Sequence, residues 1–195
     1  IVSKPTKSGY TFLGYYDAVV GGTQYYDANM SSTMTWSRTE GITLYAHWEA
    51  NEYTVTFNTN QGSGAQSAVT ATYGEEMPEI TVAPTRVGYI FLGYYDALTG
   101  GTKYYNADLT SANTWANTSN KTLYARWQGV PYYVSFNANN GTGTMATQEF
   151  EYGASEYLNS NAFTRTGYTF AGWNTAADGS GTAYANAASV LNLTS

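Results

Sequence analysis

The sequence repeats itself with a period of 79 residues. A shift of 79 positions aligns residues 1–48 with residues 80–127 without a gap, and 27 of the 48 aligned pairs are identical. The strings GYTFLGYYDA, GGTQYYDA and TLYAHW of the first copy return as GYIFLGYYDA, GGTKYYNA and TLYARW in the second. The same shift carries residues 53–91 onto residues 132–170, so that TRVGYIF is matched by TRTGYTF. Such regularity predicts several copies of one small structural unit rather than a single large fold.

The repeats divide the chain into three predicted domains. The second copy, residues 53–127, contains every segment of the unit, whereas the first copy, residues 1–48, lacks the opening strand. The third copy, residues 132–195, stops before any strand of the TLYAxW kind. We expect the missing strands to lie in a longer parent protein, and the alternative is that neighbouring chains supply them. Only four residues separate consecutive copies, so adjacent domains should nearly touch.

Alternating residue types predict that each unit consists mostly of strands. In the second copy Tyr53, Val55 and Phe57 alternate with polar residues, which is typical of a strand with one buried face. Four further strands are predicted at residues 69–73, 89–94, 102–105 and 122–127. The expected fold class is therefore mainly β, or α+β with little helix.

The segments between the predicted strands leave little room for helix. Residues 58–66 are rich in Gly and Asn and predict a hairpin loop. Residues 74–80 permit at most a short helix, because Pro78 would stop it. Residues 107–116 predict a loop or a helical turn that ends on Trp115.

Composition and charge argue against several classes of partner. The chain has 8 basic and 14 acidic residues, a formal net charge of −6, and no two basic residues in a row, so we expect no nucleic-acid binding. Apolar runs are only a few residues long, which predicts no membrane span in this segment. Cysteine is absent, so a core must hold each unit together, and 20 tyrosines can supply much of that buried area.

Polar residues form no pattern that indicates catalysis. His47 is the only histidine, and its counterpart Arg126 cannot serve as a general base, so we expect a solvent-facing strand residue. Asp17, Asp27 and Asp96 lie in predicted turns, where aspartate normally accepts hydrogen bonds from its own backbone, although calcium is the alternative. We expect no enzyme activity, no cofactor and no metal site.

A cluster of acidic residues in the second copy has the same bland interpretation. Glu75, Glu76 and Glu79 could suggest the paired carboxylates of a glycosidase. Their equivalents in the third copy are the uncharged residues Ala154, Ser155 and Leu158. Because the cluster is not part of the shared unit, we interpret it as a solvated loop.

The tyrosines leave one question open. They occur as adjacent pairs, and neighbours on a strand point to opposite faces, so one of each pair should be buried and the other exposed. These pairs are Tyr15 and Tyr16, Tyr25 and Tyr26, Tyr94 and Tyr95, and Tyr104 and Tyr105. The first interpretation is that they fill strand faces. The alternative is a binding surface of exposed aromatics at the equivalent positions Tyr15, Tyr94 and Trp173.

The combined motifs GYTFLGYYD, GGTxYY and TLYAxW, preceded by YTVTFN, resemble the Listeria–Bacteroides repeat family over nearly the whole chain. In that family the residue after the second Gly of the first motif is usually Trp, which Trp173 keeps and Tyr15 and Tyr94 replace. The resemblance implies a small β-grasp fold, similar to ubiquitin-like domains, in tandem copies of about 79 residues. It also implies a place in large extracellular surface proteins of bacteria or archaea, without catalytic residues.

Two functions remain as hypotheses. The first is a stalk or spacer at the cell surface, whose partners are the adjacent repeats of the same chain and, within a filament, neighbouring copies of the chain. The second is adhesion, in which each unit binds a host or neighbouring-cell protein or glycan weakly and repetition adds avidity. The regular period, the short linkers and the lack of a polar cluster unique to one copy favour the first.

Overall fold

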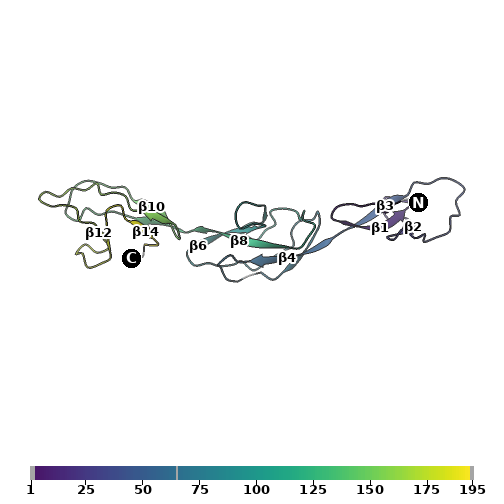
Figure 1. Ribbon diagram of the computed structural model, residues 1–195, viewed down its shortest axis with the longest axis horizontal. Helices are drawn as coiled ribbons and strands as arrows, with labels where there is room; N and C mark the ends of the chain where they lie inside the picture. Colours follow the sequence, from purple (N-terminus) through teal and green to yellow (C-terminus); the bar gives the residue numbers. More distant parts are fainter. Residues whose placement is uncertain (1–2, 65, 194–195) are drawn as a thin grey trace. The chain divides into compact units, whose positions relative to one another are not determined.

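Strands, turns and loops make up all of the chain that the computed structural model describes, residues 3–64 and 66–193 (Figure 1). This confirms a mainly β fold, and no helix occurs in those residues, nor does any segment of them form a helix that could cross a membrane. The ends of the predicted first and third domains, and Ala65 of the predicted hairpin loop, lie outside the described residues.

The segment at residues 74–80 is extended rather than helical. Gly74 has a φ of 85°, which turns the chain sharply, and the residues that follow bury Met77 and Ile80 in the core. Glu75, Glu76 and Glu79 are exposed, as expected of a solvated loop. Residues separated by three along an extended chain can both reach the core here because Pro78 interrupts regular alternation.

The chain forms two compact units, Ile1–Thr85 with Phe91–Arg126, and Arg86–Ile90 with Trp127–Ser195. The first unit begins with an antiparallel sheet of three strands in the order β2-β1-β3. Its strands are β1 (Tyr10–Tyr16), β2 (Gln24–Asp27) and β3 (Tyr45–Ala50). Phe12 of the central strand is buried, and its ring lies 5.4 Å from that of Trp48 on β3.

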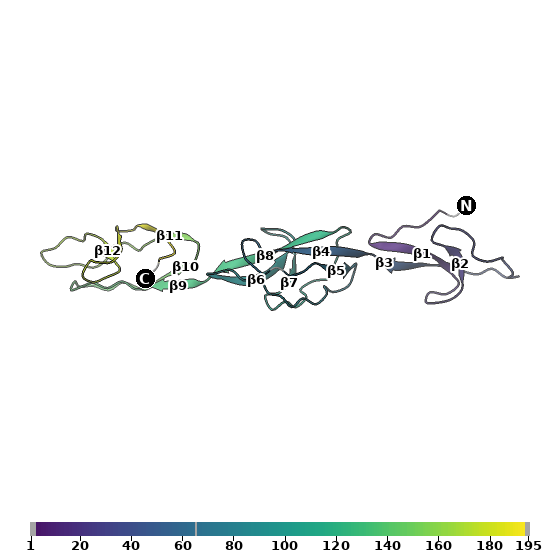
Figure 2. The same ribbon diagram turned by 90° about the horizontal axis from the view of Figure 1, so that it is seen from below.

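A sheet of five strands follows, in the order β5-β4-β8-β6-β7. Its strands are β4 (Glu52–Asn58), β5 (Val69–Thr72), β6 (Tyr89–Tyr95), β7 (Lys103–Tyr105) and β8 (Lys121–Gly129). The central strands β4 and β8 are parallel and lie side by side in both ribbon views (Figures 1 and 2). The outer pairs, β4 with β5 and β6 with β7, are antiparallel. All five strands were predicted from the sequence, to within two residues at each end.

Aromatic side chains fill both faces of the second repeat. On one face Tyr94 and Tyr105 are fully buried, and their rings pack against that of Phe57. On the other face Trp115 is fully buried, with its ring 5.2 Å from that of Tyr104. The prediction that one residue of each tyrosine pair is exposed is therefore wrong for Tyr104 and Tyr105, because the Trp115 segment covers the second face.

The first repeat follows the tyrosine prediction at one pair. Tyr25 is buried, whereas Tyr26 is 38% exposed. Trp36, the counterpart of Trp115, is 53% exposed. The difference has a local cause, because the backbone of Trp115 is paired with Gly74 and Glu75, and this chain holds no counterpart of those residues for the first repeat.

Three short antiparallel pairs make up most of the second unit. They are β9 (Pro131–Val134) with β10 (Gln148–Glu151), β11 (Ser155–Tyr157) with β14 (Ser189–Leu191), and β12 (Trp173–Asn174) with β13 (Ala183–Tyr184). Phe150, Leu158 and Val190 form the buried core, and partly buried aromatic residues pack around it. This core lies inside the third repeat.

Candidate functional site

The three residues proposed as exposed binding aromatics point toward cores. The expected exposure is wrong for Tyr94, which is fully buried with its ring 5.1 Å from that of Phe91. Tyr15 is half-buried, with its ring 5.2 Å from that of Phe12. Trp173 is also half-buried and belongs to the shell of the third repeat's core. Binding through these residues stays a prediction, without the exposure on which it depended.

A β-bulge is the physical reason for this correction. Strict alternation would place Phe12 and Tyr15, three positions apart, on opposite faces of β1. The register of β1 against β3 shifts between Phe12 and Gly14, and the extra residue brings the ring of Tyr15 to the same face as that of Phe12. Gly14 has a φ of 142° and lies so close to the carbonyl oxygen of Tyr26 that no side chain would fit.

His47 and Arg126 hold equivalent loops. The ring of His47 stacks on that of Tyr16 at 4.0 Å, and its Nε2 lies 2.8 Å from the carbonyl oxygen of Ala18. Arg126 lies over the ring of Tyr95 at 4.0 Å and donates a hydrogen bond from Nη2 to the carbonyl oxygen of Ala97. The expectation that His47 faces solvent is therefore wrong, because it is half-buried in a contact that Arg126 reproduces.

The turn aspartates accept hydrogen bonds from their own turns, as predicted. Oδ1 of Asp17 accepts from the backbone nitrogen of Thr23 at 2.7 Å, and Asp96 makes the equivalent bond to Thr102 at the same distance. Asp27 accepts from two backbone nitrogens two and four residues further on, both at 2.8 Å. Among the described residues no three His, Cys, Asp or Glu side chains gather closely enough to hold a metal ion.

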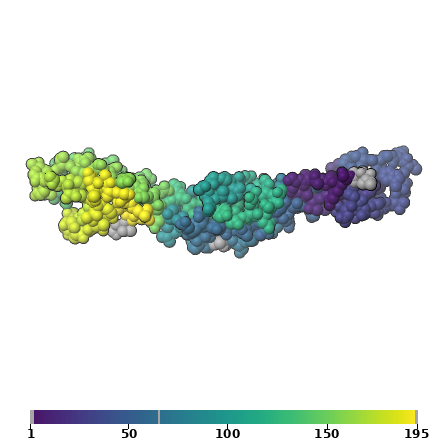
Figure 3. All heavy atoms as spheres, viewed as in Figure 1, coloured from purple at the N-terminus to yellow at the C-terminus, as the bar shows by residue number. Residues whose placement is uncertain are grey.

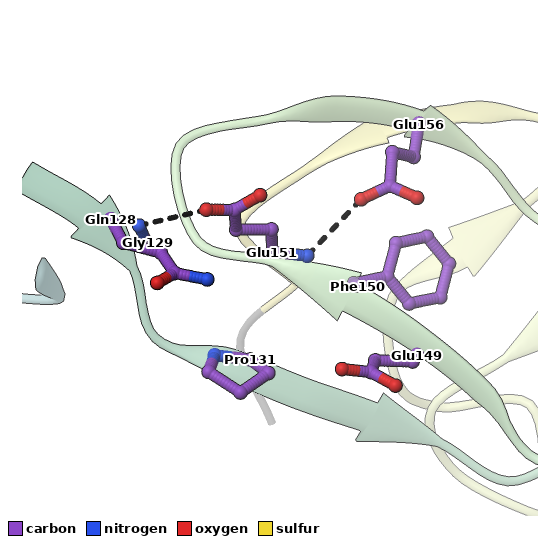
Figure 4. Close-up of a pocket in the computed structure, with 7 residues that line it drawn as sticks. All are labelled: Gln128, Gly129, Pro131, Glu149, Phe150, Glu151 and Glu156. Atoms are coloured by element: carbon purple, nitrogen blue, oxygen red, sulfur yellow. Dashed lines mark hydrogen bonds between the residues drawn. The ribbon is translucent and has the colours of Figure 1, made fainter. Parts of the chain in front are cut away.

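One acidic hollow in the second unit has a structural explanation. It is lined by Gln128, Gly129, Pro131, Glu149, Phe150, Glu151 and Glu156 (Figure 4). Oε1 of Glu151 accepts a hydrogen bond from the backbone nitrogen of Gly129 at 2.9 Å, and Oε1 of Glu156 accepts one from that of Glu151 at 3.1 Å. Two of its three carboxylates thus complete backbone hydrogen bonding. Elsewhere, the teal part of the chain shows no deep hollow on the face drawn in Figure 3.

The residues between repeats form the most distinctive feature of the molecule. Strand β3 ends at Ala50 and β4 begins at Glu52, so Asn51 alone separates them. Strand β8 ends at Gly129 and β9 begins at Pro131, so Val130 alone separates those two. The four-residue linkers expected from the sequence are therefore almost entirely strand, because their backbone groups find partners in neighbouring turns.

The contact between the first two repeats lies within the first unit. The backbone nitrogen of Asn51 donates to the carbonyl oxygen of Gly9 at 2.9 Å, and the nitrogen of Tyr73 donates to the oxygen of Asn51 at 2.9 Å. The ring of Tyr73 lies directly over Gly9, where an added Cβ would collide with it, and meets the ring of Tyr10 edge-on at 5.5 Å.

The same contact recurs within the second unit, one period later. The nitrogen of Val130 donates to the oxygen of Gly88 at 2.9 Å, and the nitrogen of Tyr152 donates to the oxygen of Val130 at 3.0 Å. The ring of Tyr152 covers Gly88 and meets the ring of Tyr89 edge-on at 5.4 Å. We call residues 7–10 and 86–89 the Gly–Tyr turns, Tyr73-Gly74 and Tyr152-Gly153 the Tyr–Gly turns, and each set of contacts a repeat junction.

Each Gly–Tyr turn is stabilised locally. Gly9 and Gly88 both have a φ of 78°, a conformation that glycine adopts without strain. The tyrosine nitrogen donates to the carbonyl oxygen three residues earlier at 3.1 Å in both turns. The cation of Lys7 lies 3.7 Å from the centre of the Tyr10 ring, and Arg86 lies 3.8 Å from that of Tyr89. The recurrence of Gly-Tyr and Tyr-Gly dipeptides was visible in the sequence, but their contact was not.

Short units built from strands, joined by residues that are themselves strand, define a tandem-repeat β protein. The chain belongs to the Listeria-Bacteroides repeat domain family, which matches residues 1–47, 53–126 and 132–194. The resemblance stated from the motifs is thereby confirmed.

Relatives of known name are much longer than this chain. A protein of Evansella cellulosilytica, named as a membrane protein, is 37% identical over 182 residues, which cover 91% of this chain and 25% of the relative. Internalin H of Listeria monocytogenes is 43% identical over 123 residues, covering 63% of this chain and 20% of the relative. A second E. cellulosilytica protein, named as a Gly-rich membrane protein, is 36% identical over 86% of this chain and 18% of its own length.

The chain thus spans a quarter or less of these relatives. It carries a repeat domain found in surface and membrane-type proteins, and neither the family description nor these names indicate a catalytic function. No solved structure matches the chain.

Proposed function

We propose that this chain is a non-catalytic repeat segment of a large extracellular, cell-surface protein, and that it acts as a stalk or spacer. The observation that carries the proposal is the repeat junction, which recurs with the same hydrogen bonds and ring contacts in both units. A spacer must resist bending between its modules, and a paired, ring-covered connection is stiffer than a flexible linker. The length and names of the relatives support the cell-surface setting.

The proposed unit of this spacer is a β-grasp-like domain. The arrangement of the second repeat supports it, since a parallel central pair, β4 and β8, is flanked by the hairpin partners β5 and β7 with β6. The order of strands along the chain places the first and last strands together at the centre of the sheet. The repeat lacks the helix that usually covers such a sheet, and the extended segment with Met77 and Ile80 fills that place.

Adhesion through repeated exposed aromatics has weaker support. Tyr133 and Tyr157 are 64% and 69% exposed, but their counterparts one period earlier are Thr54 and Pro78. Exposed aromatic residues therefore do not recur from repeat to repeat, as avidity through a common site would require.

Distance measurements across the first junction test the spacer proposal. The chain has no cysteine, so Val20→Cys and Val82→Cys, at exposed positions of the first and second repeats, provide two sites for spin labels. We expect a narrow distribution of label distances that broadens when Tyr73→Ala removes the ring over Gly9. Tyr133→Ala, at an exposed tyrosine outside the junctions, serves as the control and should leave the distribution narrow. A broad distribution in the chain without Tyr73→Ala would contradict the spacer.

A further inference from the structure

The third repeat contains a third Gly–Tyr turn, residues 165–168, with the geometry of the other two. The nitrogen of Tyr168 donates to the carbonyl oxygen of Arg165 at 3.0 Å. Gly167 has a φ of 79°, and the guanidinium of Arg165 lies 4.0 Å from the centre of the Tyr168 ring. The turn is therefore fully formed in the same conformation as at residues 7–10 and 86–89.

This third turn differs from the others in what covers it. Rings of Tyr73 and Tyr152 cover Gly9 and Gly88, whereas an added Cβ at Gly167 would meet no atom within 4 Å. Tyr168 is 66% exposed, while its counterparts Tyr10 and Tyr89 are half-buried. An aromatic side chain held beside an uncovered, left-handed glycine is a preformed surface whose ordering cost has already been met by the turn.

The two repeat junctions identify what fits this surface. At each of them the occupant is the start of the following repeat, which supplies one linker nitrogen to the glycine oxygen and one Tyr–Gly turn over the glycine. The sequence contains only two Tyr-Gly dipeptides, and both are already engaged, Tyr73 over Gly9 and Tyr152 over Gly88. A second copy of this chain therefore has no unengaged Tyr–Gly turn to offer.

We propose that the turn at residues 165–168 is a docking site for the start of a further Listeria–Bacteroides repeat. The Tyr–Gly turn of that repeat would place its ring over Gly167 and edge-on to Tyr168, and its linker residue would donate a backbone hydrogen bond to the oxygen of Gly167. The site recognises a neighbouring module by one ring and one backbone donor, so it accepts any repeat that keeps the Tyr-Gly dipeptide. This proposal does not depend on the stalk function.

An extended chain tests the docking site directly. Residues 117–195 are appended a second time after Ser195, which adds a TLYARW strand, a linker and a Tyr–Gly turn. Amide hydrogen exchange of residues 165–170, followed by mass spectrometry, is compared between the 195-residue chain and the extended chain. We expect exchange in this segment to slow by about tenfold or more in the extended chain. The segments around residues 7–12 and 86–91 should keep their protection in both.

Two variants of the extended chain separate docking from mere lengthening. Tyr→Ala at the appended copy of Tyr152 removes the ring, and Gly167→Val fills the place that the ring would occupy. Each should return exchange at residues 165–170 to the rate of the 195-residue chain. Protection of the appended copies of β9 and β10 reports whether the added repeat folds, and Gly167→Val decides if the Tyr→Ala variant does not fold.

Three results would overturn the proposal. Unchanged exchange at residues 165–170 in an extended chain whose added repeat is folded would show that nothing docks there. Slow exchange that persists in Gly167→Val would show that the protection has another source. Slowing that develops in the 195-residue chain as its concentration rises would assign the site to a second copy instead.

Discussion

Buried tyrosine hydroxyls are the most unusual chemical groups in this molecule. Tyr94, Tyr104 and Tyr105 are buried, and burial raises the pKa of each phenol above its usual value, most strongly for Tyr105. The Tyr105 hydroxyl donates to the carbonyl oxygen of Pro78 at 2.8 Å. Desolvation disfavours the charged form, so these side chains stay protonated in the core. In the unfolded chain they ionise at an ordinary pKa of about 10.

The raised pKa values predict loss of stability at alkaline pH. The stabilisation is fully present below the unfolded pKa and declines as pH rises above about 10, by at most about 1.4 kcal/mol per pH unit for each phenol. Tyr105→Phe should make this decline shallower, while costing about 1 kcal/mol at neutral pH through the hydrogen bond lost to Pro78. Urea unfolding followed by circular dichroism between pH 7 and 11 measures both effects.

The exposed Tyr133 provides the control for this experiment. Tyr133→Phe also removes one phenol, but it leaves all three buried hydroxyls in place. It should keep the full alkaline decline. A Tyr105→Phe protein whose stability falls as steeply as that of the unaltered chain would contradict burial as the cause.

Strands and turns were predictable from the sequence to different degrees. Alternation in Tyr53, Val55 and Phe57 predicted β4 because a strand with one buried face imposes a period of two. The faces of later strands were mispredicted where a single bulge inverts the alternation, as at Gly14. Nothing in the local pattern signals such a bulge, because it is fixed by the register of the partner strand.

The connecting residues show a second limit of local prediction. Residues 49–52 have no turn signal and no clear alternation, so they were taken as a linker. Their strand conformation depends on Gly9 and Tyr73, which lie 42 and 22 residues from Asn51 in sequence (51 − 9 and 73 − 51). The junction, and with it the candidate site, therefore required the fold. Only the 79-residue recurrence of its dipeptides was accessible beforehand.

The Gly–Tyr turns offer a matched test of the junction. Gly88→Ala imposes a left-handed conformation on alanine, at about 1–2 kcal/mol, and also displaces the ring of Tyr152. Gly167→Ala imposes the same conformation, but its Cβ meets no atom. We expect Gly88→Ala to lower the free energy of unfolding by about 1 kcal/mol more than Gly167→Ala, since an aromatic contact is also lost. Equal losses in urea denaturation would show that the ring contributes nothing.

Neighbouring repeats should unfold together because of these contacts. In an array of repeats, stability is the sum of the intrinsic stability of each unit and the interaction with its neighbours. The second and third repeats share Gly88, Val130 and Tyr152 through backbone and ring contacts within one compact unit. Each repeat is small for a domain without disulfides, so interaction with a neighbour is a large fraction of its stability.

Removing one ring should uncouple the third repeat. Tyr152→Ala leaves the core residues Phe150, Leu158 and Val190 in place but deletes the ring over Gly88. Calorimetry should show a single transition for the unaltered chain and two for Tyr152→Ala, the lower one belonging to the third repeat. Tyr157→Ala, at a tyrosine that is 69% exposed, is the control and should keep one transition. Two transitions in the unaltered chain would contradict the coupling.

The parallel pairing of β4 and β8 has a mechanical consequence. The chain enters the second repeat along β4 and leaves it along β8, and the two strands run in the same direction side by side. Tension applied at both ends of the repeat therefore pulls these strands past each other lengthwise. The hydrogen bonds between them share that load and must break together rather than one by one, so the repeat is built to resist being drawn out.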